Sequence, residues 1–209
     1  MLTLIKREIE DNIVYFLGAV ILATIAIAIS IIVASHNNKD ALLIIFLVFA
    51  VITGISMFGF CAMGAAQMYT DKIKKISSFL STLPVTRNKI FIARVTAGIL
   101  AVLTFIVPMI IITKIHIYFL SPPIPLFYGM IPEIFAPIFL MNLACYCFGL
   151  NTGWSRTVLT PTLGGLALTC ILIPLVIVKG FDLHITIILL IFVISSLIFI
   201  WHKFMTTSL

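Results

Sequence analysis

Long apolar runs fill this chain and are separated by short polar passages. Each run is uncharged and extends over about twenty residues, the length that a helix needs to cross a bilayer core of roughly 30 Å. The pattern therefore predicts an all-α integral membrane protein with six transmembrane helices in one membrane domain, residues 1–209. The predicted spans are residues 13–34, 41–66, 95–113, 134–150, 158–178 and 185–201.

The first polar passage, residues 1–12, has a helical period. Leu2, Ile5, Ile9 and Ile13 recur at steps of three and four, and Lys6, Arg7 and Glu10 fall away from that row. Such a pattern is typical of an amphipathic helix that lies in the membrane interface. A frayed terminus is the alternative, and we favour the interfacial helix.

The longest polar passage, residues 67–94, separates the second and third spans. Apolar residues recur there at three- and four-residue steps, with lysines and serines largely between them, which predicts an amphipathic helix that begins near Thr70 or Asp71. Pro84 ends this helix, and Thr86 caps the next one, which starts around Arg87. The apolar row consists of Ile73, Ile76, Phe79, Leu80 and Leu83.

This amphipathic helix has two interpretations from pattern alone. It could lie on the membrane with its lysines at lipid phosphates, or it could form a docking surface for a soluble partner. The lysines in question are Lys72, Lys74 and Lys75, which with Ser78 and Ser81 fall largely between the apolar positions.

Composition and charge support a membrane location. The chain is 62% hydrophobic and 10% charged, and its net charge is +6. Alternating the loops between two sides places ten of the thirteen Lys and Arg residues with the termini and the 67–94 passage, and three on the other side. Because basic residues collect on the cytoplasmic side, we expect both termini to be cytoplasmic in a protein of the cell inner (plasma) membrane. The same rule explains the charge without a nucleic-acid partner.

Motifs for chemistry are missing from the sequence. None of the eleven glycines is followed by Lys, so there is no Walker A motif, and HExxH and GxSxG patterns are absent too. The four cysteines lie in apolar runs and indicate neither a metal site nor a disulfide framework. We therefore expect no enzyme activity, no metal and no cofactor in this chain. The spans also lack the buried carboxylates and basic groups of ion-coupled carriers, with Glu133 the nearest case.

A few features inside the spans indicate how the helices pack or bend. Asn142 needs a hydrogen-bond partner in hydrocarbon, and we prefer an interhelical bond to a substrate contact. Gly149 and Gly153 form a GxxxG pattern suited to helix packing. Prolines in the third to fifth spans suggest hinges, and the four prolines of residues 114–133 predict a loop or re-entrant segment on the outer side. The span prolines are Pro108, Pro137, Pro161 and Pro174.

The passage YTDKIKKISSFLSTLPVTRNKIFIAR resembles the segment between the second and third spans of ABC-2 type transporter permeases. In that family a polar start and a short helix lead to an LPVTR-like step and a basic re-entry into the membrane, here Leu83 to Arg87 and Arg94. The resemblance implies an ABC exporter permease that pairs with a second permease copy, as a homodimer or heterodimer, while a separate ABC ATPase subunit binds ATP. It implies that the ATPase contact is made by Asp71, Ile73, Ile76, Phe79, Leu80, Leu83 and Arg87.

One departure from the family keeps alternatives open. Many ABC-2 permeases have re-entrant helices between the last two spans, whereas the long outer connection here lies between the third and fourth. A haem-export-like permease of cytochrome c maturation, which has the same six spans, is one alternative. A non-transporting membrane anchor or assembly protein is the other.

Overall fold

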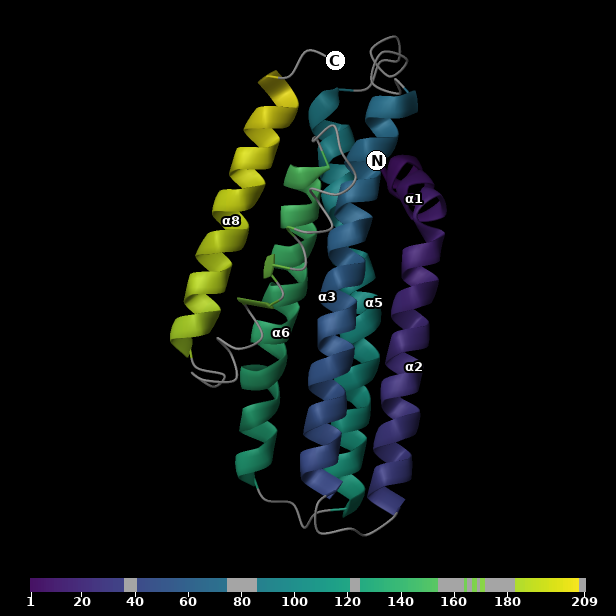
Figure 1. The fold of residues 1–209 in the computed structure, drawn as a ribbon, viewed down its shortest axis with the longest axis vertical. Coiled ribbons are helices and arrows are strands. Elements are labelled where there is room, and N and C mark those ends of the chain that lie inside the picture. The colour runs from purple at the N-terminus through teal and green to yellow at the C-terminus, as the bar shows by residue number, and fades with distance from the viewer. Residues whose placement is uncertain are drawn as a thin grey trace.

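The computed structural model describes residues 1–35, 41–74, 86–120, 125–153, 164, 167–168, 170–171 and 183–206. Every regular element in these ranges is a helix, and the long helices lie side by side as one bundle (Figure 1). The start of the first described helix (Leu2–Asp11) and the end of the last one (Leu183–Thr206) lie at the same end of this bundle, which we call the terminal end (Figure 1). The helices are α1 (Leu2–Asp11), α2 (Ile13–Ser35), α3 (Ala41–Lys74), α5 (Arg87–Leu120), α6 (Pro125–Thr152) and α8 (Leu183–Thr206).

Five of these helices contain a stretch that is long and apolar enough to cross a membrane. The stretches are Ile13–Ile32, Leu47–Thr70, Arg87–Ile115, Glu133–Thr152 and Leu183–Thr206. They overlap the predicted first, second, third, fourth and sixth spans. The predicted span at residues 158–178 lies largely outside the described residues, so the count of six stays a prediction.

The connection after the third span differs from the prediction. We expected a loop or re-entrant segment over residues 114–133, but α5 continues to Leu120 and α6 already begins at Pro125. Pro132 lies within α6, as Pro108 lies within α5. A proline in a membrane helix is tolerated where neighbouring groups satisfy the freed carbonyl.

Glycines let the backbones of α3 and α6 touch. A Cβ atom at Gly64 would overlap the Tyr146 carbonyl oxygen and lie 2.8 Å from the backbone nitrogen of Leu150. On α6, a Cβ at Gly149 would overlap the carbonyl oxygen of Cys61, and one at Gly153, the residue that follows the helix, would lie 2.7 Å from the Ala65 carbonyl oxygen. The GxxxG pattern of α6 is thus a helix-packing contact, as the sequence predicted.

A buried hydrogen bond reinforces the same pair of helices. Asn142 is fully buried on α6, where its Nδ2 donates to the Ile138 carbonyl at 2.8 Å. Its Oδ1 accepts a hydrogen bond from the Ser56 hydroxyl of α3, also at 2.8 Å. The interhelical bond that we expected for Asn142 is therefore confirmed, and it fixes the register of α6 on α3.

The glycine contact yields a prediction with an internal control. Gly149→Ala should lower the free energy of unfolding in detergent by about 1–3 kcal/mol, since the added methyl has no room between the two backbones. Gly59→Ala is the matched control on α3, because a Cβ there meets no atom within 4 Å. Unfolding followed by circular dichroism in a detergent–SDS titration measures both. Equal midpoints for the two variants would contradict the packing described here.

Candidate functional site

A group of buried or partly buried side chains, most of them polar, lies near the terminal end of the bundle. Its members are Glu8 of α1, Gln67 and Met68 of α3, Arg94 of α5 and Tyr146 of α6, and we call them the Arg94 cluster. Four helices that are distant in sequence thus contribute to one polar site.

The short helix α1 brings Glu8 to this site. Glu8 lies on the same helix face as the partly buried Ile5 and Ile9, and this face packs on α5. The opposite face carries two exposed ion pairs, Lys6–Glu10 and Arg7–Asp11, each at 3.8 Å. The helix therefore presents one carboxylate to the bundle and its other charges away from it.

Arg94 is the buried cation at the centre of the cluster. Its side chain is only 3% exposed, although it lies two turns inside the apolar helix α5. Its Nη2 is 3.4 Å from Oε1 of Glu8, and its Nη1 is 3.5 Å from the sulfur of Met68. The ion pair joins α1 to α5, and the sulfur contact joins α5 to α3.

Tyr146 connects the same point to α6. Its hydroxyl lies 3.0 Å from the Arg94 carbonyl oxygen and 2.8 Å from Oε1 of Gln67. A hydroxyl has one hydrogen to donate. With the Gln67 amide turned by 180°, its Nε2 donates to Tyr146, which donates to Arg94. That arrangement also gives a partner to the buried Nε2, which otherwise has none among the described residues.

A glycine makes room for the tyrosine ring. A Cβ atom at Gly98 of α5, one turn beyond Arg94, would overlap the ring of Tyr146 and lie 2.7 Å from its hydroxyl oxygen. The ring therefore lies directly against the α5 backbone. Gly98 and Arg94 together define where Tyr146 sits between α5 and α6.

Electrostatics make the ion pair important for the fold. A charged guanidinium in an apolar helix bundle is expensive unless an opposite charge and further hydrogen bonds accompany it. Removing one partner of a buried pair typically costs about 3–5 kcal/mol. The exposed pairs of α1 contribute less than about 1 kcal/mol each.

Contacts from α8 hold the beginning of α5 as well. Nε1 of Trp201 donates to Oδ1 of Asn88 at 3.1 Å, and the rings of Phe91 and Phe204 lie with their centroids 5.7 Å apart. Nζ of Lys203 reaches Oδ1 of Asn151 on α6 at 3.3 Å. The first two turns of α5 are therefore held by α1 on one side and by α8 on another.

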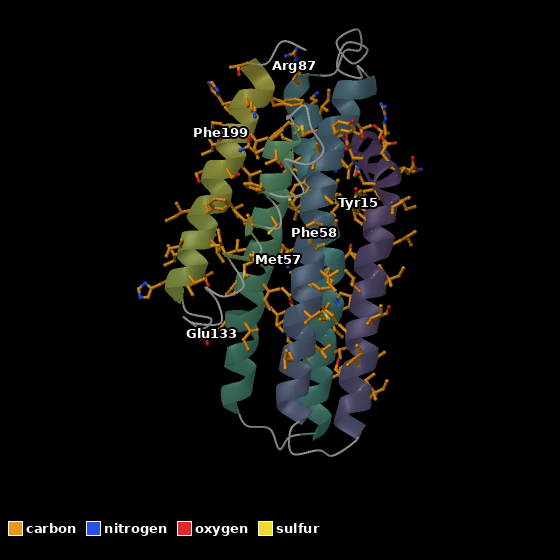
Figure 2. All side chains as sticks on the ribbon, in the orientation of Figure 1. Tyr15, Met57, Phe58, Arg87, Glu133 and Phe199 are labelled. Carbon is orange, nitrogen blue, oxygen red and sulfur yellow. The ribbon has the colours of Figure 1, made fainter. Side chains whose placement is uncertain are left out.

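The predicted ATPase contact falls mostly outside the described part of the chain. Asp71 and Ile73 belong to the last turns of α3, which are helical to Lys74. Arg87 begins α5 at the terminal end of the bundle, where Figure 2 labels it, and its side chain is exposed. Ile76, Phe79, Leu80 and Leu83 lie outside the described residues, so their predicted role is not tested.

Arg94 requires a correction. We placed it in the polar passage and expected no buried basic group in the spans, but it is buried inside a membrane-length helix. Two sequence signals pointed there. Apolar residues surround Arg94, whose neighbours include Ile92 and Val95, and Glu8 lies with the apolar face of its helix rather than with Lys6.

The rest of the described surface offers less chemistry. A mostly apolar groove of about 100 Å³ lies between α2 and α3 and contains no charged side chain. Among the described residues, no three His, Cys, Asp or Glu side chains gather as a metal site would require. The groove is lined by Val14, Tyr15, Gly18, Ala19, Leu22, Ser56, Gly59 and Phe60.

Comparison of the chain with protein-family models, curated proteins and solved structures finds no match. Any assignment of function therefore rests on the residues and geometry described above.

A pair of single substitutions tests the buried ion pair. Glu8→Gln should lower the free energy of unfolding in detergent by about 3 kcal/mol, because it leaves the Arg94 charge without its carboxylate. Glu10→Gln on the same helix should change it by less than about 1 kcal/mol. The two SDS unfolding midpoints decide the matter, and indistinguishable midpoints would show that Glu8 does not compensate Arg94.

Proposed function

We propose that this chain is the membrane-spanning permease subunit of an ATP-driven ABC-2 type exporter. The observation that carries the proposal is the place where α3 ends and α5 begins. The sequence between these two helices resembles the family's coupling segment, and both helix ends lie at the terminal end of the bundle (Figure 1). The apolar stretch of α3 ends at Thr70 but the helix continues to Lys74, so α3 extends beyond its membrane stretch toward that segment.

The distribution of basic residues supports a cytoplasmic location for this end. Exposed Lys6 and Arg7 lie on α1 there, and Arg87 and Lys89 begin α5 at the same end. Lys114 lies toward the opposite end of α5. Basic residues collect on the cytoplasmic side of membrane proteins, which is also where an ATPase subunit finds its nucleotide.

The proposed mechanism assigns the energy source to another chain. Two ATPase subunits bind the 71–83 segments of two permease copies, and their ATP-driven closure displaces those segments. This movement is transmitted to α3 and α5, the two helices that flank the segment. Their movement changes the transport pathway from inward-open to outward-open. The export direction follows the family that the segment resembles.

Copurification in a mild detergent tests this proposal. The wild-type chain should retain a Walker A-containing ATPase, detected by mass spectrometry and by ATP hydrolysis of the purified complex. Phe79→Asp combined with Leu80→Asp should reduce the retained ATPase at least tenfold, because charges replace the apolar row of the predicted coupling helix.

Ser78→Asp with Ser81→Asp is the matched control, since it adds the same charge to the polar face of that helix. This variant should retain the ATPase. If no ATP-binding protein accompanies the wild-type chain, the permease assignment is wrong and the membrane-anchor alternative is favoured.

A further inference from the structure

The two helices that flank the α3–α5 connection both contribute to the Arg94 cluster. Gln67 lies seven residues before Lys74, the last described residue of α3, and Arg94 lies seven residues after Arg87, where α5 starts. Seven helical residues rise about 10 Å. A displacement of the connection therefore arrives at the Arg94 cluster through both helices before it reaches the apolar body of the bundle.

Within the Arg94 cluster, the ion pair between Glu8 and Arg94 joins α1 to α5 and can transmit such a displacement to α1. The remaining ion pairs of α1, Lys6–Glu10 and Arg7–Asp11, are internal to the helix. Because separating Glu8 from Arg94 would leave a buried charge unbalanced, α1 follows α5 rather than sliding over it.

The junction after α1 continues the connection into the membrane. Asn12 is buried, and its side-chain Nδ2 donates to the Glu8 carbonyl at 2.8 Å. Its own carbonyl accepts the first hydrogen bond of α2, from Tyr15 at 3.0 Å. The side chain of Asn12 thus links Glu8, the residue that pairs with Arg94, to the beginning of α2.

From these contacts we infer that Glu8 and Arg94 are positioning residues that transmit movement of the α3–α5 connection to α1 and through Asn12 to α2. This inference rests on the proposed function, because it requires an ATPase that moves the connection. It gives α1 an active role, in place of the passive interfacial anchor that its sequence pattern suggests.

A double substitution tests whether the ion pair couples α1 to α5 while leaving the protein folded. Glu8→Met with Arg94→Met removes both charges and keeps the packing volume, a replacement that buried ion pairs often tolerate. Lys6→Met with Glu10→Met removes an exposed pair from the same helix and serves as the control. Glu8→Arg with Arg94→Glu restores the pair in reverse and remains informative if the methionine variant fails to fold.

The readout is the distance between spin labels at Thr3 on α1 and Ala136 on α6, both exposed, measured by double electron–electron resonance. Cys170, which is exposed, is replaced by serine, and labelled chain is diluted with unlabelled chain. The complex with its copurified ATPase is examined without nucleotide and after trapping with ATP and vanadate. We expect the distance to shift on trapping in the wild type, the Lys6/Glu10 control and the reversed pair.

In the methionine variant we expect a broadened distribution without nucleotide and no shift on trapping, although the ATPase remains bound. A shift that persists there, or no shift in a wild-type complex that contains the ATPase, would overturn the inference while leaving the proposed function intact. If no ATPase copurifies, both the proposed function and the inferred transmission of movement to α1 and α2 are wrong. The nucleotide-free distributions still decide whether the ion pair holds α1.

Discussion

The burial of one guanidinium constrains the arrangement of this bundle. Arg94 lies inside an apolar helix, where its charge requires an acid and further polar neighbours. Glu8 supplies the acid, so α1 must lie against α5. Met68 contacts the guanidinium from α3, and Tyr146 of α6 contacts the Arg94 backbone carbonyl. The helices that surround Arg94 are therefore the ones that supply partners for its guanidinium, α1 and α3, and for its backbone carbonyl, α6.

A second constraint acts on α3 and α6 and has a different physical origin. Gly64 and Gly149 bring the two backbones into contact, and the bond between Ser56 and Asn142 fixes their register. In lipid, where hydrocarbon surrounds every helix, close packing and interhelical hydrogen bonds provide the association that the hydrophobic effect provides in water. These two helices form a pair that cannot slide without losing both kinds of contact.

The sequence predicts the apolar elements well because the bilayer sets a simple rule. Uncharged runs of about twenty residues become helices, and five of the predicted spans coincide with membrane-length helices. The GxxxG pattern and the lone Asn142 also predict their contacts, since each needs a specific neighbour in hydrocarbon. These are local features whose consequences hardly depend on the rest of the chain.

What the sequence does not reveal depends on contacts between distant helices. From the sequence alone, a charged residue at the edge of an apolar run is assigned to a loop, because no compensating charge can be identified. The ion-pair partner of Arg94, Glu8, is 86 residues away in the chain. The prolines of residues 125–133 read as breaks because local propensity excludes them from a helix, but the bundle accommodates them in α6. The ATPase contact predicted at residues 71–87 lies mostly in the part of the chain that the structure does not describe.

The two constraints together suggest which parts of the bundle can move. Sliding α6 along α3 would force glycine-lined backbones apart and open a void, which costs packing energy over a large area. The Arg94 cluster is held instead by a few polar contacts among α1, α3, α5 and α6. The permease function proposed above would need a rigid helix pair and a movable contact close to the segment that binds the ATPase. We propose that the α3–α6 pair and the Arg94 cluster meet these two requirements.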